Sequence, residues 1–188
     1  MRSQTVRAHG SAGFSLIELI LVLGLATTVS AIAIGVLGSM SAVIQGDADM
    51  RLIEQQLRLA RETAINQRRS IEIRFTPPNM IQTVRRDLPA GTSAVSTAAL
   101  EHHAIFMTFA AQGDTPDGFG NATPTSFTAA GAVMFTSDGM FTDANGNPVN
   151  GSIFIGQPNK PMTARALTIF GPTASIRTFR WNGSAWRR

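Results

Sequence analysis

One long run of apolar residues dominates the first quarter of the chain. Between Phe14 and Ile44 the sequence has a single charged residue, Glu18, in 31 positions. A helix of this length would extend for about 46 Å, which exceeds the roughly 30 Å hydrocarbon core of a bilayer. The run therefore predicts a transmembrane helix over about residues 14–34 that continues beyond the bilayer.

A second helical pattern follows a short polar step at residues 46–49. Over Arg51–Arg69, apolar residues recur at the spacing of one helix face. The stripe consists of Ile53, Leu57, Ala60 and Ala64. We therefore expect the first helix to continue as an amphipathic segment that lies on a sheet, with Glu54 and Arg58 forming an i, i+4 pair on its outer face.

Beyond Ser70 the pattern changes to short alternating runs between turn residues, which is typical of β-strands. The predicted strands are Ile71–Phe75, Met80–Arg85, Ala104–Phe109, Ala132–Thr136, Ser152–Gly156, Ala166–Phe170 and Ser175–Trp181. Leu88–Ala99 and Ala110–Thr128 are rich in small residues and are expected to form surface loops. A helix followed by such strands predicts an α+β fold, with one long helix on an antiparallel β-sheet.

Composition adds two constraints. Apolar residues make up 44% of the chain and charged residues 15%, a skew that comes largely from the N-terminal run. Cysteine is absent, so neither disulfides nor thiolate chemistry is available. The 188 residues are expected to form one globular unit with an appendage, held together by packing alone.

Charge is distributed unevenly along the chain. Arg2 and Arg7 precede the apolar run and no basic residue follows until Arg51, so the positive-inside rule predicts a cytoplasmic N-terminus and an exported body. Further on, residues 87–143 hold six acidic residues and no Lys or Arg, whereas residues 144–188 hold six basic residues and no acid. This polarity could steer assembly or attract an anion, or the two groups could pair within one domain.

Glu18 distinguishes between interpretations of the apolar run. A secretory signal peptide cleaved near Val29-Ser30-Ala31 and a plain membrane anchor both gain nothing from an acid. A charged residue inside a spanning helix costs about 2.5–3.5 kcal/mol on insertion scales, so it indicates a function and a cationic partner.

The segment Gly13-Phe14-Ser15-Leu16-Ile17-Glu18-Leu19 offers a third interpretation, because it resembles the cleavage and methylation motif of type IV pilin-like precursors. The resemblance implies that a prepilin peptidase cuts after Gly13 and that the new terminal amine of Phe14 is methylated. It also implies the cation: the Phe14 ammonium group of one subunit would pair with Glu18 of its neighbour as the helices assemble into a filament.

A looser resemblance covers Ala132 to Trp181, whose hydrophobic and glycine pattern is similar to that of H-type minor pseudopilins (the GspH/FimT family). Members of that family often end in a Gly-Arg dipeptide on the last strand. This chain has Ser175-Ile176-Arg177 and Phe179-Arg180 in its place. The two resemblances together imply a type IV pilin-like fold. Its parts would be a cleaved leader (1–13), a transmembrane and filament-core helix (14–44) and a periplasmic globular domain (45–188).

The resemblances imply a structural role. The chain would be a minor pseudopilin near the tip of a type II secretion pseudopilus that supports protein secretion, or a minor pilin of a type IV pilus. It would reside in the bacterial inner membrane with one span, the N-terminus in the cytoplasm and the body in the periplasm, before it enters the filament. Its partners would be the lipid bilayer, other pseudopilins or pilins through the N-terminal helix, the prepilin peptidase and the inner-membrane assembly platform.

Basic and aromatic residues alternate at the C-terminus, around an Asn182-Gly183 turn. The residues concerned are Arg177, Arg180, Trp181, Trp186, Arg187 and Arg188. Arginines bind phosphates and aromatic rings stack on bases, so the cluster offers an alternative function as a DNA-binding minor pilin in natural transformation. The other interpretation is an edge hairpin whose Trp residues pack on the body.

Catalytic and metal-binding patterns are absent from the sequence. It contains no phosphate-binding glycine loop, no zinc-protease helix and no glycine-flanked nucleophilic serine. Asp143-x-Asn145 opens like a calcium loop but lacks the later glycine and glutamate, so we expect a hairpin turn at Asn145-Gly146. His102 and His103 would point to opposite sides of a strand and so could not share a metal. We expect neither enzymatic activity nor a cofactor.

Overall fold

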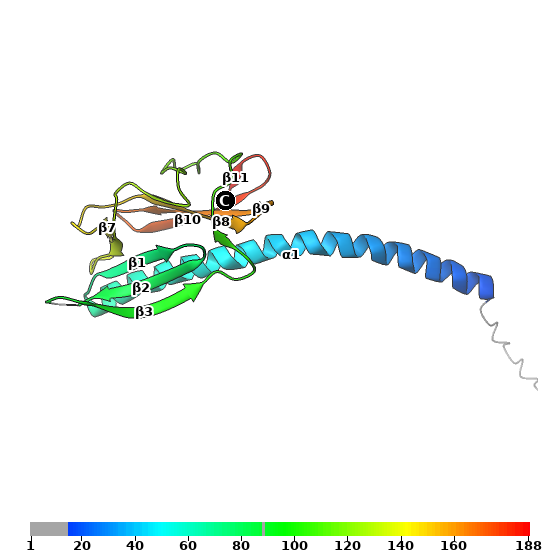
Figure 1. Ribbon diagram of the computed structural model, residues 1–188, viewed down its shortest axis with the longest axis horizontal. Coiled ribbons are helices and arrows are strands. Elements are labelled where there is room, and N and C mark those ends of the chain that lie inside the picture. Colours follow the sequence, from blue (N-terminus) through cyan, green and yellow to red (C-terminus); the bar gives the residue numbers. More distant parts are fainter. Residues whose placement is uncertain (1–14, 88) are drawn as a thin grey trace, which may run out of the picture. The chain divides into compact units, whose positions relative to one another are not determined.

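The computed structural model describes residues 15–87 and 89–188, without the side chains of residues 33–39. The chain divides into two units, Met1–Met40 and Ser41–Arg188, and each is considered by itself. The described part holds one helix, α1 (Leu16–Gln67), followed by strands in the order shown in Figure 1. These are β1 (Ile71–Thr76), β2 (Met80–Arg86), β3 (Thr92–Ala99), β4 (Ile105–Phe106), β5 (Thr125–Phe127), β6 (Val133–Phe135), β7 (Phe141–Asp143), β8 (Gly151–Gln157), β9 (Lys160–Phe170), β10 (Ser175–Trp181) and β11 (Trp186–Arg187).

The helix α1 is uninterrupted across the polar step at residues 46–49, as predicted. Its 52 residues include no proline, and the acidic Glu18 lies in the first turn, where it interacts favourably with the helix dipole. The expected pair of Glu54 and Arg58 is confirmed, with 2.6 Å between the guanidinium Nη2 and the carboxylate Oε1. The helix ends at Gln67, and the next residue, Arg68, has a positive φ of 51°.

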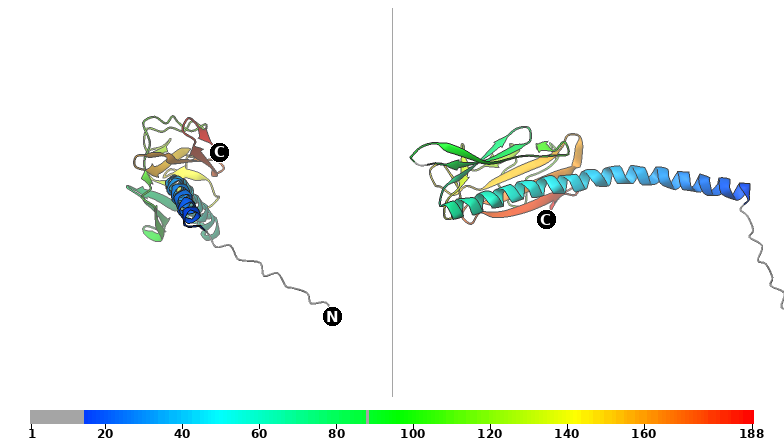
Figure 2. Two further views of the ribbon diagram at one scale, coloured as in Figure 1. Left: turned by 90° about the vertical axis from the view of Figure 1, so that its right-hand side faces the viewer. Right: turned by 90° about the horizontal axis from the view of Figure 1, so that it is seen from below.

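The strands form two antiparallel sheets. The first has the order β3-β2-β1-β6-β7, and the second has the order β11-β10-β9-β8-β4, with β5 also paired to β8. The α+β class with antiparallel strands is therefore confirmed, but the expectation of one sheet is wrong. The first sheet ends at the three-residue β7, and the second sheet is built on β8 and β9, to which the earlier strands β4 and β5 add at β8. The helix segment in this unit therefore has strands on two sides (Figure 2).

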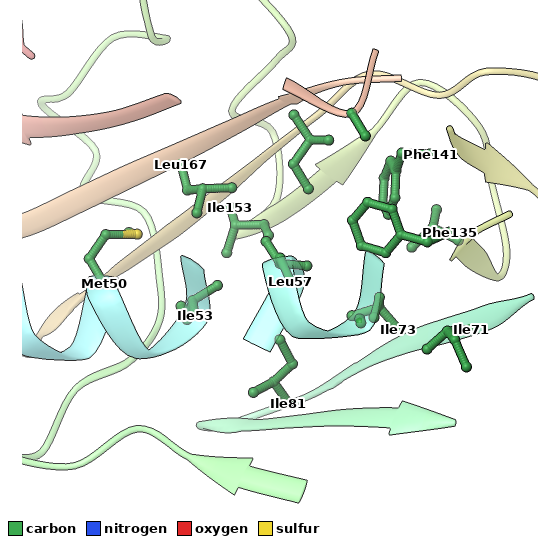
Figure 3. Packing of buried hydrophobic residues seen from close by; sticks show 14 of the residues in the cluster. Met50, Ile53, Leu57, Ile71, Ile73, Ile81, Phe135, Phe141, Ile153 and Leu167 are labelled. Atoms are coloured by element: carbon green, nitrogen blue, oxygen red, sulfur yellow. The ribbon is translucent and has the colours of Figure 1, made fainter. Parts of the chain in front are cut away.

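One hydrophobic core joins α1 to both sheets, as the close view in Figure 3 shows. The predicted stripe is confirmed, because Ile53, Leu57 and Ala64 have no exposed surface and Ala60 has almost none. Their partners from the strands are Ile71 and Ile73, Ile81, Val133 and Phe135, Phe141, Ile153 and Ile155, and Leu167 and Ile169. Burial of these side chains is the main favourable contribution to folding, at about 1.5–3 kcal/mol for each large side chain.

Two of the expected loops contain strands. Residues 92–99 form β3, which pairs with β2 along its length, and residues 125–127 form β5. Conversely, the strand expected over Ala104–Phe109 is reduced to the two residues of β4. Ala, Ser and Thr have weak or context-dependent strand preferences. The conformation of β3 is therefore determined by its hydrogen bonds with β2 and not by the local sequence pattern.

Candidate functional site

The N-terminal part of α1 presents an apolar surface that no described residue of the chain covers. All described side chains from Ser15 to Ile32 are exposed, and Leu16, Ile17 and Ile32 each expose more than 70% of their surface. Soluble monomers rarely expose a continuous apolar patch of this extent. The described residues therefore leave this apolar surface exposed.

The polar side chains of this segment are already satisfied within the helix. Thr27 Oγ1 donates to the carbonyl oxygen of Gly24 at 2.9 Å, and Thr28 Oγ1 donates to that of Leu25 at 2.9 Å. Ser30 Oγ donates to the carbonyl oxygen of Ala26 at 2.7 Å. Because each hydroxyl bonds to the preceding turn, the three residues can enter an apolar medium without leaving a donor unpaired.

Glu18 is the exception, because it is the only ionisable side chain between Ser15 and Ile44 and it is exposed. Gly13 and Phe14, the predicted cleavage and methylation sites, lie outside the described residues. The predicted pair between Glu18 and a Phe14 amine therefore stays a prediction. By length and mean hydropathy together, no helix among the described residues qualifies as a membrane span.

A buried arginine attaches the next part of α1 to the second sheet. Arg165 of β9 is only 2% exposed, and its Nε donates to Asp47 Oδ1 at 2.5 Å. Its Nη2 donates to the carbonyl oxygen of Val43 at 2.9 Å, and its Nη1 donates to the carbonyl oxygens of Met162 and Ala164. Four acceptors and a counter-charge compensate the desolvation of the guanidinium group, so the side chain ties two turns of the helix to β9.

At the polar step, residues 46–49, the helix backbone comes close to β9. A Cβ at Gly46 would lie 2.8 Å from the carbonyl oxygen of Thr163, so only glycine permits this approach. Gln157 Nε2 donates to Gln45 Oε1 at 3.2 Å nearby. The sequence analysis identified the polar residues 46–49 but not Arg165 as the residue that binds them. The only signal for Arg165 in the sequence is a charged residue within an apolar strand pattern.

Asp49 forms a separate contact on the other side of the step. It is 2% exposed; its Oδ1 accepts a hydrogen bond from the backbone N of Glu101, while His102 Nδ1 lies 3.6 Å from Oδ2. Burial raises the pKa of Asp49, although the Glu101 hydrogen bond and His102 oppose that shift. His102 and His103 lie in a turn with φ of 52° and 62°, so the strand geometry considered for this pair does not apply.

The aromatic residues of the C-terminal cluster are buried. Trp181 and Trp186 are each 7% exposed and pack in a second hydrophobic cluster with Phe154, Phe179 and two alanines. The indole Nε1 of Trp186 donates to the carbonyl oxygen of Gly113 at 2.8 Å. The rings are therefore unavailable for base stacking, which corrects that part of the DNA-binding interpretation.

Two arginines of the same cluster, Arg177 and Arg180, lie on opposite faces of β10, and Arg187 lies on β11. Arg177 pairs with Asp117 at 2.6 Å, so acidic and basic halves of the sequence do pair within the domain here. Arg180 and Arg188 instead line a pocket beside Arg51 of α1, and Arg187 is the cross-strand partner of Arg180. The structure thus brings Arg180 and Arg188 to one pocket and places Arg177 elsewhere, in an ion pair with Asp117. Phosphate binding by these arginines stays a prediction.

The turn at Asn145-Gly146 is confirmed. Asp143 Oδ1 accepts hydrogen bonds from the backbone N of Asn145 at 2.8 Å and of Asn147 at 2.9 Å, and Gly146 has a φ of 86°. Hydrogen bonds from Asn147 are the main cause that lowers the pKa of Asp143. The carboxylate that suggested a calcium loop therefore organises its own hairpin turn.

No protein-family model and no curated protein sequence matches the chain. Two solved structures of the minor pseudopilin EpsH from the type II secretion system of Vibrio cholerae are similar to it. The first is 13% identical with a TM-score of 0.46, and the match covers 74% of this chain and 96% of that one. The second is 14% identical with a TM-score of 0.44, and the match covers 78% and 95%. Likenesses at this level assign no function.

Proposed function

We propose that this chain is a structural subunit of a filament assembled at the bacterial inner membrane, a minor pseudopilin or minor pilin. The observation that carries the proposal is the exposed apolar surface of α1 from Leu16 to Ile32, which contains one acid, Glu18. This surface directly follows the Gly13-Phe14 motif of pilin-like precursors. Its work is assembly, without an enzymatic step.

The acid and the apolar surface support the proposal together. A lipid-embedded helix alone would be more stable with an apolar residue at position 18. A terminal amine from a neighbouring subunit would neutralise the carboxylate, so assembly would remove the cost of the isolated charge. Glu18 would thus favour the filament over the single subunit in the bilayer.

The attachment by Arg165 also suits a filament subunit. Because Arg165 holds Val43 and Asp47, and Leu57 is fully buried, residues 43–57 and the sheets form one packed unit. Residues 43–57 and the sheets would therefore take their place in a filament together, as one unit.

The finer parts of the proposal rest on the resemblance to H-type minor pseudopilins. The subunit would stand near the tip of a type II secretion pseudopilus and support protein secretion. A prepilin peptidase would remove residues 1–13, the assembly platform would extract the helix from the inner membrane, and residues 45–188 would be periplasmic. The buried Trp rings leave the DNA-uptake alternative without its stacking surface, so it is not proposed.

The decisive test is replacement of Glu18 by leucine in the host cell. We expect Glu18→Leu to enter membranes normally, since the helix becomes more apolar, but to be lost from sheared or purified filaments by at least about tenfold, because the compensating charge pair is gone. Immunoblots of membrane and filament fractions measure both quantities. Glu62→Gln, which removes an exposed acid from the same helix, is the matched control and should assemble normally.

Intact-mass analysis of the membrane-extracted chain tests processing separately. The expected mass corresponds to a chain that begins at Phe14 and carries one added methyl group. An unprocessed N-terminus in a cell that has the peptidase, or unchanged assembly of Glu18→Leu, would refute the proposed function.

A further inference from the structure

The edges of the two sheets differ in how well they are protected against pairing with another chain. Natural proteins shield edge strands by making them short or by placing charges on them. Most terminal strands here are short: β7 and β5 have three residues each, and β11 and β4 have two each. Asp143 and Arg187 add a charge to β7 and β11.

Strand β3 has neither protection. It is the terminal strand of the first sheet and runs for eight residues, Thr92–Ala99, with the sequence TSAVSTAA. None of the eight is charged and none is proline. On the inner face it is anchored, because Ser96 Oγ donates to Gln56 Oε1 of α1 at 2.8 Å and contacts Thr83 Oγ1 at 2.6 Å. The strand is therefore firmly placed while its outer edge stays open.

The backbone groups at this edge can be assigned from the β2–β3 ladder. Leu100 N donates to the carbonyl oxygen of Asn79 at 2.8 Å, and hydrogen-bonded positions alternate in an antiparallel pair. Ala98 and Ser96, opposite Ile81 and Thr83, therefore direct their backbone groups to β2. Thr97, and Ala99 next to the strand end, direct theirs to the open edge.

An irregularity limits the length of edge that can pair. Thr83 lies opposite Ser96 but Val84 lies opposite Ala94, so Val95 is an extra residue, a β-bulge. A bulge twists an edge and interrupts pairing, which leaves the four residues 96–99 as the regular part.

We propose that the open edge of β3 pairs with the same edge of a second copy of this chain, antiparallel across a twofold axis at Ala98. In this register Thr97 of each copy faces Ala99 of the other, and their outward N–H and C=O groups form about four backbone hydrogen bonds. The first charged residue beyond the strand, Glu101, falls opposite Val95 of the second copy. No like charges therefore meet, and the small side chains of residues 96–99 do not obstruct the approach.

The contact is small. A strand edge of this length buries less than the roughly 1,000 Å² expected of a stable interface between soluble proteins. We therefore expect association only at the high local concentration of a bilayer, and a covalent trap is needed to detect it. This pairing rests on the proposed insertion of the helix into a membrane but not on filament assembly, because it uses the domain edge and not Glu18.

Because the chain contains no cysteine, a thiol-specific crosslinker reacts selectively with an introduced cysteine. Full-length Thr97→Cys in lipid vesicles, treated with a short bismaleimide, should give a crosslinked dimer, because the two introduced thiols lie diagonally across the paired edges. Thr173→Cys is the matched control: Thr173 is also exposed, but it lies in the turn between β9 and β10 of the other sheet. It should give at least about fivefold less dimer at the same protein-to-lipid ratio.

Two edge variants test the mechanism in the Thr97→Cys background. Ala99→Lys brings two ammonium groups to the pair, and Ala99→Pro removes an outward N–H; each should lower the dimer yield by about fivefold or more. Thr173→Lys adds the same charge elsewhere and should leave the yield unchanged. Tryptophan fluorescence of each variant verifies folding. Equal crosslinking at Thr97 and Thr173, no dimer, or crosslinks only to a different protein would overturn the proposal.

Discussion

The two halves of α1 have the same secondary structure but place their apolar residues differently. In residues 16–32 apolar side chains surround the helix and every described side chain is exposed. In residues 50–67 one apolar stripe, which includes Ile53 and Leu57, is fully buried, whereas Leu59 and Ile65 outside it are 47% and 43% exposed. The first half carries one acid in an apolar surface, whereas the second carries charged pairs such as Glu54–Arg58 on its outer face.

The difference shows where each half obtains its stabilisation. The second half is stabilised by contacts within the chain, so its substitutions should appear in the free energy of unfolding. Residues 16–32 have no such contacts with the described part of the chain, so under the proposed function their substitutions should appear in membrane insertion or assembly. Matched substitutions in the two halves can separate these two effects.

The largest difference is expected for leucine truncation. Leu57→Ala should lower the free energy of unfolding by about 2–5 kcal/mol, because it removes fully buried methyl groups and leaves a cavity. Leu21→Ala, at a side chain that is 60% exposed, should change it by less than about 0.5 kcal/mol. Urea unfolding of the full-length chain in detergent, followed by the fluorescence of Trp181 and Trp186, measures both. Equal losses would contradict the division of the helix.

Glycine substitution should give a smaller contrast. Gly46→Ala places a methyl group 2.8 Å from the Thr163 carbonyl oxygen and should cost about 1–3 kcal/mol, because the helix must move away from β9. At Gly24 an added Cβ meets nothing within 4 Å, so Gly24→Ala should leave domain stability unchanged. The same unfolding assay distinguishes them. If Gly46→Ala is neutral, the close approach is not required.

The pH dependence of Asp49 should be the smallest effect. Burial raises its pKa in the folded chain above the unfolded value, so the native state retains a proton that the unfolded state loses. Stability should therefore fall as pH rises from the ordinary aspartate pKa through the raised one, and the loss should persist above it. Asp49→Asn keeps the acceptor for the Glu101 amide and should be more stable than the wild-type chain at neutral pH.

The pH series contains its own control. The advantage of Asp49→Asn should shrink in acid, below the ordinary aspartate pKa, where Asp49 is protonated in both states. Unfolding of both chains from below the ordinary aspartate pKa up to neutral pH measures this advantage. An advantage that grew toward acid would show that the carboxylate is stabilised in the fold and would contradict the assigned direction.

Sequence reasoning succeeded where short-range pattern determines the structure. The helix stripe at Ile53 and Leu57, the strand Ser175–Trp181 and the Asn145-Gly146 turn follow from local periodicity and turn chemistry, and all are confirmed. It failed for β3, whose conformation depends on pairing with β2. It also left open whether the C-terminal Trp residues were exposed or buried, because an alternating strand does not show which of its faces is covered.

By itself the sequence determined the long apolar segment, its single acid and the antiparallel α+β class, because hydrophobic periodicity and the cost of an isolated charge are local properties. Only the tertiary structure decided that there are two sheets, that Arg165 holds the helix, and that Trp181 and Trp186 are buried. Arg165 and Asp47 are 118 residues apart, and no local pattern specifies a contact between such distant residues. The unprotected edge of β3 became visible for the same reason, because a strand is an edge only in relation to the strands around it.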